Sequence, residues 1–251
     1  RASRLGAALV VTLGLTACTV GAPPGFSSGD SWAFPLVGPL EDGVLLVPVT
    51  INGKGPFLFA LDPDAPMTSI DEGVAVALDL YGGIGGRLFD EADTSHPIKV
   101  AEVTAFQLGN LTVKNRTFAL HPDGAYRAAG RVLTGIIGRD ILAESLVFAF
   151  DRDAGMAYLA TRDVFTAPDT PIKLSYRDTP LKTGLVEVSG TSRRVVRGTV
   201  NGVEHDLHVD LGAFQSQLRP ALWAAAHLTP IPYRATLVDE VGTTRTVDKG
   251  G

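Results

Sequence analysis

The chain has 251 residues, of which 45% are hydrophobic and 20% charged, enough to bury a core in one large or two small domains. Its 22 Lys and Arg against 27 Asp and Glu give a net charge of -5, and no basic run exceeds two residues, which argues against a nucleic-acid-binding protein. A single cysteine excludes a disulfide scaffold and a cysteine-based metal cluster, while 28 glycines and 16 prolines between short apolar runs favour β structure.

The N-terminal segment is predicted to be a lipoprotein signal peptide, residues 1–17, with basic residues followed by an uncharged apolar run. Leu15-Thr16-Ala17-Cys18 matches the bacterial lipobox, in which the cysteine thiol is acylated, so Cys18 is the predicted lipidation site. The alternative is an ordinary signal peptide with a chance cysteine. Residues 18–31 are rich in Gly, Pro and Ser and are expected to form a flexible tether. Thr19, in place of Asp, predicts anchoring in the outer membrane, facing the periplasm or the cell surface.

The next segment predicts a β-hairpin that leads to an aspartate. Val44–Ile51 and Phe57–Leu61 flank Asn52-Gly53, and Asn-Gly is the strongest short hairpin signal because both residues accept a positive φ. Asp62 follows the second strand directly, and Ile70–Leu80 has the pattern of a helix.

Further hairpins are predicted between residues 80 and 161. Gly82–Gly86 is not followed by the Lys-Ser/Thr of a phosphate-binding loop and is interpreted as a mobile connection. The predicted paired strands are Val100–Leu108 with Leu111–Leu120, and Ser145–Asp151 with Met156–Ala160. Gly135-Ile136-Ile137-Gly138 lies between the two hairpins.

The pattern of the first hairpin returns after a linker predicted over residues 161–170. The strands at 195–200 and 205–209 flank Asn201-Gly202, Asp210 follows, and Leu218–Leu228 predicts a second helix. The 148-residue offset between Asp62 and Asp210 is that of a domain rather than of a short repeat, which indicates an internal duplication.

These motifs resemble those of the aspartic peptidases, particularly the bacterial retropepsin-like proteins. The matching residues are the loops Asp62-Pro63-Asp64-Ala65 and Asp210-Leu211-Gly212-Ala213 and the apolar-apolar-Gly element Ile136-Ile137-Gly138. The resemblance implies an all-β fold of two pseudo-symmetric β-barrel lobes, with one aspartate from each lobe at their interface.

The resemblance also implies a mechanism and a set of site residues. The expected catalytic pair is Asp62 and Asp210, which share a proton and activate a water for peptide hydrolysis without a cofactor. The expected partner is a polypeptide substrate or peptide ligand. The expected supporting residues are Asp64, Ala65, Gly212, Ala213, Ile136, Ile137 and Gly138. By the same analogy, residues 86–100 are expected to cover the cleft.

The predicted lobes are residues 32–165 and residues 171–251. The second lacks a counterpart of the Gly135–Leu142 segment and is expected to be incomplete, and the chain starts with Arg rather than Met, so both ends are expected to continue. The oligomeric state is left open.

Two departures from the family's Asp-Thr/Ser-Gly pattern favour an alternative function. Pro63 and Leu211 lack the hydroxyl that interlocks the family's two loops, and Asp64 replaces a glycine. The alternative is therefore a catalytically inactive peptide- or protein-binding lipoprotein with the same fold. Asp64 itself is interpreted as a solvated turn residue rather than as a substitute acid or a cation ligand.

Competing site chemistries have weaker support in the sequence. Strand alternation places His208 and Asp210 on one face and His205 on the other, and neither a cysteine nor a helical Glu accompanies them, so no metal site is expected. A serine hydrolase is disfavoured because the chain has no Gly-x-Ser-x-Gly.

Overall fold

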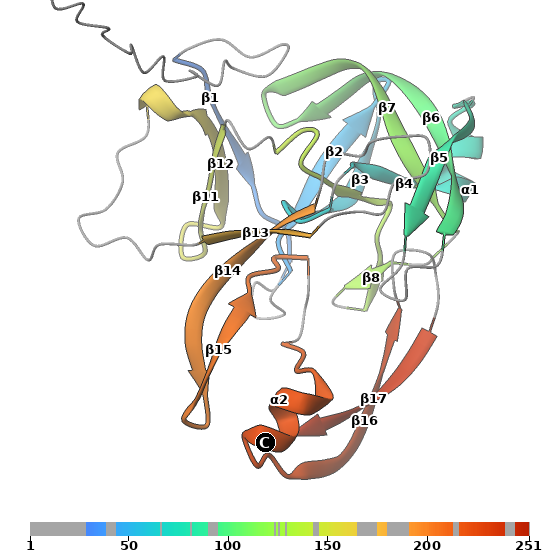
Figure 1. Cartoon of the computed structure of the whole chain (residues 1–251). Coiled ribbons are helices and arrows are strands. Elements are labelled where there is room, and N and C mark those ends of the chain that lie inside the picture. The colour runs from blue at the N-terminus through green and yellow to red at the C-terminus, as the bar shows by residue number, and fades with distance from the viewer. Residues whose placement is uncertain are drawn as a thin grey trace, which may run out of the picture.

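The computed structural model describes residues 29–38, 44–65, 67–80, 82–89, 95–122, 124, 126–128, 130–142, 146–164, 175–179, 191–212, 216–238 and 244–250. Most of these residues form β-strands, which confirms the all-β class (Figure 1). The predicted signal peptide, Cys18 and most of the predicted tether lie outside the described residues.

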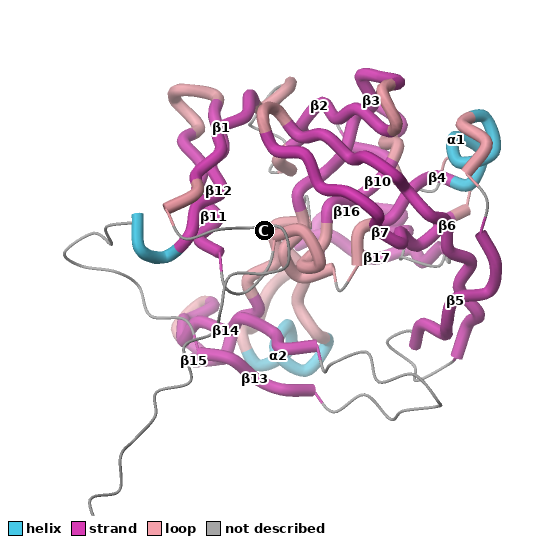
Figure 2. The backbone as a smooth tube through the Cα atoms, turned by 90° about the horizontal axis from the view of Figure 1, so that it is seen from above, coloured by secondary structure: helices cyan, strands magenta, loops and turns pink. Residues whose placement is uncertain are grey.

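Six strands close into a barrel, which Figure 2 shows from above. They pair in the order β2, β3, β10, β4, β7 and β6, and β6 pairs back with β2. The β3–β10 and β4–β7 pairs are parallel, and the other pairs are antiparallel. The strands are β2 (Leu46–Ile51), β3 (Lys54–Leu61), β4 (Ser69–Asp71), β6 (Ser95–Leu108), β7 (Leu111–His121) and β10 (Gly135–Ile137).

Phenylalanines from three different strands fill the centre of the barrel. Phe59, Phe106 and Phe118 are fully buried. The ring centroids of Phe59 and Phe106 lie 5.5 Å apart, and those of Phe106 and Phe118 lie 5.1 Å apart, both edge to face. Such pairs add about 0.5–1.5 kcal/mol each to the stabilisation from burial, so the barrel is a packed core that can hold loops rigidly at its rim.

The glycine-rich run expected to be a mobile connection is instead a strand, β5 (Gly82–Phe89), which pairs with the first half of β6. The physical reason is close packing of backbone on backbone. A Cβ at Gly82 would lie 1.4 Å from the carbonyl oxygen of Val100, and one at Gly85 would lie 2.3 Å from Val100 Cγ1. The glycines therefore allow β5 to approach β6, where larger residues would not fit.

The two helices are shorter than predicted. They are α1 (Glu72–Ala77) and α2 (Pro220–Ala225). Ile70 belongs to β4 instead, and Asp71 caps α1 by accepting a hydrogen bond from the Val74 amide at 3.1 Å. No helix among the described residues is long and apolar enough to cross a membrane.

A second sheet, formed by β1, β12 and β11, packs beside the barrel. Its strands are β1 (Ser31–Pro35), β11 (Leu146–Asp151) and β12 (Met156–Thr161), followed by the 3-10 turn η2 (Arg162–Val164). The predicted closing hairpin is thus confirmed. Phe34 of β1 is fully buried in the same cluster as the barrel core, which attaches this sheet to the barrel.

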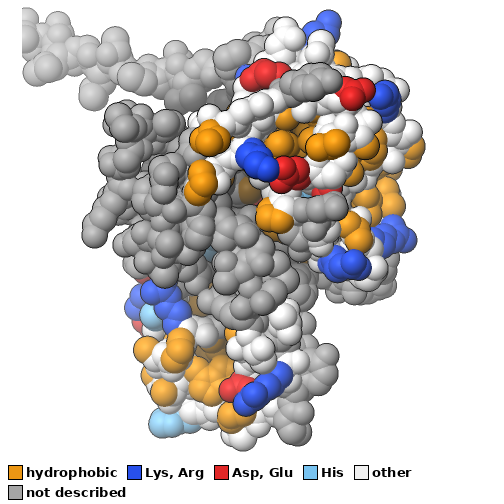
Figure 3. Space-filling model, turned by 90° about the vertical axis from the view of Figure 1, so that its right-hand side faces the viewer, with side chains coloured by type: hydrophobic (Ala, Val, Ile, Leu, Met, Phe, Trp, Pro, Cys, Tyr) orange, Lys and Arg blue, Asp and Glu red, His pale blue; other side chains and the backbone are white. Residues whose placement is uncertain are grey.

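The rest of the chain forms two smaller sheets and α2, which Figure 1 shows below the barrel. The strands are β13 (Ser175–Thr179), β14 (Thr191–Val200), β15 (Val203–His208), β16 (Pro230–Val238) and β17 (Thr244–Gly250). The remaining pair is β8 (Arg127–Ala128) with β9 (Arg131–Val132). On the face shown in Figure 3, the described Lys and Arg side chains lie in small separate groups among acidic and hydrophobic ones.

Both predicted Asn-Gly hairpins are confirmed. Asn52 and Gly53 have φ values of 48° and 77°, and Asn201 and Gly202 have 47° and 83°. These values suit the tight turns that join β2 to β3 and β14 to β15. Each hairpin ends next to one of the two predicted catalytic aspartates.

Candidate active site

The first aspartate loop begins where β3 ends, at the rim of the barrel. The Asp62 amide donates a hydrogen bond to the carbonyl oxygen of Ile137 at 3.0 Å, which continues the parallel pairing of β3 with β10. Asp62 Oδ1 accepts a hydrogen bond from the Asp64 amide at 2.9 Å, and the Ala65 amide donates to the Asp62 carbonyl at 3.2 Å. The loop is therefore a tight turn that fixes one carboxylate oxygen of Asp62.

The segment Ile136-Ile137-Gly138 lies directly against this loop, as the resemblance implied. Besides the contact with Asp62, the Arg139 amide donates to the carbonyl oxygen of Ala65 at 2.9 Å. A Cβ at Gly138 would lie 2.5 Å from the backbone carbon of Met67 and 2.9 Å from the Ala65 oxygen. Only glycine allows the two backbones to pass this closely.

Thr68 and Asp140 also hold the loop, and neither was among the predicted site residues. The Thr68 amide and hydroxyl donate to Asp140 Oδ1 at 2.8 and 2.7 Å, and the hydroxyl accepts from the Gly138 amide at 3.1 Å. Burial raises the pKa of Asp140 from 3.8, while the hydrogen bonds from Thr68 oppose that rise. The sequence signal that could have identified them is their position, since Thr68 follows Ala65 by three residues and Asp140 follows Gly138 by two.

The second aspartate loop follows β15 and repeats the turn of the first. The Gly212 amide donates to Asp210 Oδ1 at 2.8 Å, as the Asp64 amide does to Asp62. Asp210 is exposed, whereas Asp62 is partly buried. Ala213, a predicted supporting residue, lies outside the described residues. Both α1 and α2 begin ten residues after their aspartates, so the local order of elements is the same.

The fold brings the two loops together. Carboxylate oxygens of Asp62, Asp64 and Asp210 all lie within 4.8 Å of one another. The approach is closest at Gly212, where a Cβ would lie 2.3 Å from Asp62 Oδ2. The sequence-predicted catalytic pair is therefore adjacent, and a third carboxylate, from Asp64, accompanies it.

The electrostatics of the group favour a proton on Asp62. Burial raises the pKa of Asp62 from 3.8 to about 7, with the negative charge of Asp210 the next largest cause, and the charge of Asp64 adds to the rise. The hydrogen bonds from the Asp64 and Ala65 amides oppose the rise. Asp62 therefore keeps its proton through the acid range, beside a second carboxyl group from the other loop.

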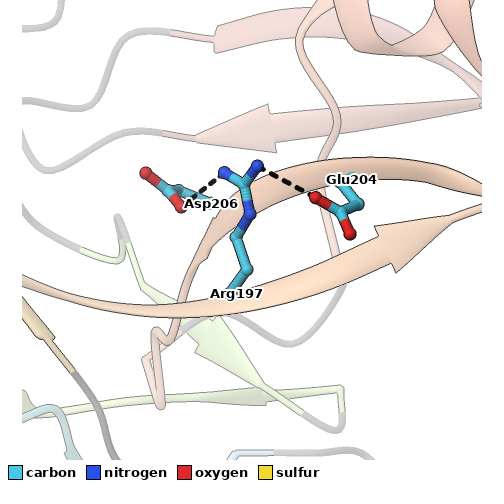
Figure 4. A network of polar contacts seen from close by, with 3 residues as sticks. All are labelled: Arg197, Glu204 and Asp206. Carbon is cyan, nitrogen blue, oxygen red and sulfur yellow. Dashed lines mark hydrogen bonds and ion pairs between the residues drawn. The ribbon is translucent and has the colours of Figure 1, made fainter.

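Two contacts fix the hairpin that carries Asp210. Arg197 of β14 donates to Asp206 Oδ1 at 3.0 Å and to Glu204 Oε2 at 3.2 Å, both on β15 (Figure 4). These hydrogen bonds, with Asp206 the larger cause, raise the pKa of Arg197. At the other end of the hairpin, Asn201 Nδ2 donates to the carbonyl oxygen of Ala226 at 2.7 Å, which attaches the turn to the end of α2.

The three carboxylates are close enough to share a cation, because their oxygens can converge on one point. Exposed acidic groups commonly cluster without an ion. A further titratable side chain beside them is His208 at the end of β15, whose Nε2 lies 3.7 Å from Asp64 Oδ1. Asp64 is thus not the solvated turn residue expected from the sequence, since only 11% of its side chain is exposed.

The first aspartate loop lies in a segment that matches a known protein family. Residues 47–141 match the family model described as aspartyl protease, which supports the resemblance to the aspartic peptidases over a range that includes Asp62 and β10. A crystal structure of a retropepsin-like aspartic protease from Rickettsia conorii is similar at 13% identity, covering 52% of this chain and 89% of that chain with a TM-score of 0.37. No curated protein is similar enough to count as a match.

Proposed function

We propose that this protein is a peptidase that hydrolyses peptide bonds with a water activated between Asp62 and Asp210. The observation that carries the proposal is the juxtaposition of these two carboxyl groups, within 4.8 Å, with the pKa of Asp62 raised to about 7. Two adjacent carboxyl groups cannot both ionise without a large cost in free energy, so they share one proton. General acid–base hydrolysis requires such a pair, with one group protonated and one ionised. The family match over residues 47–141 supports the reaction class.

In the proposed reaction each carboxyl group has one role. Asp210 accepts a proton from the water as its oxygen attacks the carbonyl carbon of the peptide, and Asp62 donates its proton to the carbonyl oxygen. The tetrahedral intermediate then collapses: Asp210 gives its proton to the amide nitrogen, a hydroxyl of the intermediate returns a proton to Asp62, and the C–N bond breaks. The Asp64 and Gly212 amides hold Asp62 Oδ1 and Asp210 Oδ1, so the remaining oxygens are oriented for these transfers.

We propose that the N-terminal lobe, which contains the barrel, and the β13–β17 segment form a pseudo-symmetric pair that arose by duplication. The shared amide-to-carboxylate turn and the helix ten residues after each aspartate support this reading. The two proposed lobes are residues 32–165 and residues 171–251, the bounds predicted from the sequence.

The test is cleavage of a peptide library by the mature chain between about pH 3 and 8, beside Asp62→Asn and Asp210→Asn. Cleavage should be lost in both variants, and in the wild type it should decline as the pH rises through about 7, where Asp62 loses its proton. Undiminished cleavage by Asp210→Asn would disprove the two-aspartate mechanism.

The same experiment distinguishes the alternative of a non-catalytic binding protein. Pro63 and Leu211, which have no side-chain hydrogen-bonding group, favour that alternative. It predicts that the folded wild-type protein retains bound peptides without cleaving any of them. Cleavage that depends on both aspartates would exclude it.

We further propose that the protein is anchored to the bacterial envelope through lipid on Cys18. The support is the lipobox Leu15-Thr16-Ala17-Cys18 and the position of the chain's one cysteine within it. Two or more acyl chains give durable anchoring. Cells fed a labelled fatty acid should label the wild type but not Cys18→Ala, and equal labelling of both would contradict the proposal.

A further inference from the structure

A contact between two ionisable side chains joins the first aspartate loop to the strand that leads to the second. His208 is the last residue of β15, two positions before Asp210, and its Nε2 lies 3.7 Å from Asp64 Oδ1 on the first loop. The exposed fraction is 11% for the Asp64 side chain and 33% for that of His208, so the contact is shielded from water mainly on the side of Asp64. Such shielding makes an ion pair stronger than one on an open surface.

The two loops differ in how firmly the described residues hold them. The first loop is bonded to β10 through the amides of Asp62 and Arg139 and through the hydroxyl of Thr68. The second leaves the end of a three-stranded sheet that shares no strand pairing with the barrel. Among the described residues, a side-chain contact between the two segments can therefore help to place this loop against Asp62.

The side chains at the second position of each loop cannot form a polar link, because Pro63 and Leu211 have neither a donor nor an acceptor. Asp64 and His208 can. His208 is the last residue of the strand that leads to Asp210, so this strand also delivers an imidazole to Asp64.

We propose that Asp64 and His208 form an ion pair that positions the two aspartate loops against each other and compensates the third negative charge beside Asp62 and Asp210. This inference rests on the proposed function, in which the pair would act as positioning residues rather than as catalytic residues. The ion pair would give Asp64 a role that Gly212, at the matching position of the second loop, cannot have because it lacks a side chain.

The charge compensation predicts in which direction each substitution changes the titration of Asp62. The titratable side chains placed against Asp64 come from both segments: Asp62 on its own loop, and Asp210 and His208 on the other. Histidine is the side chain that ordinarily changes charge between pH 5 and 8. Removing the Asp64 carboxylate takes a negative charge away from Asp62, whereas removing a protonated imidazole takes a positive one away, so the two changes are expected to act on Asp62 in opposite directions.

The experiment follows the carboxyl carbon of Asp62 by NMR in a pH titration, which requires no catalysis. Asp64→Asn should lower the pKa of Asp62 and His208→Gln should raise it, each by roughly half a unit to one unit. His205→Gln is the matched control, because this exposed histidine lies on the opposite face of β15. Shifts of the same sign in both variants, or shifts no larger than in the control, would overturn the proposal.

Cleavage kinetics give a second readout of the same proposal. His208→Gln should lower kcat about tenfold with little change in KM, and the double variant with Asp64→Asn should be no slower than the slower single variant. Additive losses in the double variant would show that the two residues act independently. If the wild type cleaves nothing, the proposed function fails, whereas the NMR titration still decides the role of the pair.

Discussion

Replacing Asp62 with asparagine is expected to stabilise the folded protein at pH 8 while changing its stability little at pH 4. The reason is the pKa of Asp62, which burial and the charge of Asp210 raise from 3.8 to about 7. Between pH 3.8 and about pH 7, Asp62 keeps its proton in the folded state but releases it in the unfolded chain. The free energy of unfolding therefore falls as the pH rises across this window, and the full loss is present above about pH 7.

The size of the effect follows from the same two values. The difference between 3.8 and about 7 corresponds to a destabilisation on the order of 4 kcal/mol above pH 7, which is an upper limit for the gain in Asp62→Asn. Asparagine has a similar shape and keeps an oxygen that can accept the hydrogen bond from the Asp64 amide. The substitution therefore removes the charge without removing the turn.

Urea unfolding at about pH 4.5 and pH 8 measures this difference. Asp210→Asn is the control, and it should give a smaller gain at pH 8 because it removes one cause of the raised Asp62 pKa but leaves the burial. A residual dependence on pH is expected in Asp62→Asn, since burial also raises the pKa of Asp140. If wild type and Asp62→Asn lost the same stability between the two pH values, the protonation of Asp62 assigned here would be wrong.

A stabilising substitution at a proposed catalytic position has a physical meaning. Residues selected only for stability rarely keep a carboxyl group in a place where burial disfavours its charge. Asp62 retains such a group at the rim of a packed barrel, next to a second carboxyl group. The instability is therefore an argument for function at this position, in line with the usual conflict between stability and activity.

The features that the sequence predicted well are local. The two Asn-Gly turns and their flanking strands depend on a few adjacent residues, and both hairpins formed where they were expected. The aspartates could be placed because each directly follows such a hairpin. Alternation along β15 also correctly placed His208 beside the loop.

The features that the sequence did not predict depend on contacts between distant segments. Thr68 and Asp140 are 72 residues apart, and no periodic pattern signals that one hydroxyl bridges a carboxylate and the Gly138 amide. The pairing of Gly82–Phe89 with β6 was missed for a similar reason, because glycine has a low strand propensity and is favoured there only by the nearby backbone of Val100. The low exposure of the Asp64 side chain and its contact with His208 likewise were not visible in the local sequence.

Replacing Gly212 with alanine is expected to reduce cleavage strongly without unfolding the protein. The new Cβ would lie 2.3 Å from Asp62 Oδ2 and 2.5 Å from its Cγ, closer than atoms in proteins approach, so the Asp62 carboxyl or the second loop must move. The backbone φ of Gly212 is not in the left-handed region, so alanine itself causes no backbone strain there. The steric clash is therefore expected to shift the two loops relative to each other.

A displacement of about 1 Å in a catalytic pair can reduce the rate by about 100-fold, and kcat/KM for peptide cleavage should fall by at least about that factor. Gly198→Ala is the matched control, because its Cβ would meet only the end of the flexible Leu207 side chain, 2.8 Å away, on the same hairpin. That variant should cleave like the wild type, and both variants should show cooperative unfolding. If Gly212→Ala cleaved as fast as Gly198→Ala, Asp62 could not lie against the second loop during the reaction, and a mechanism that needs both aspartates within reach of one water would have to be abandoned.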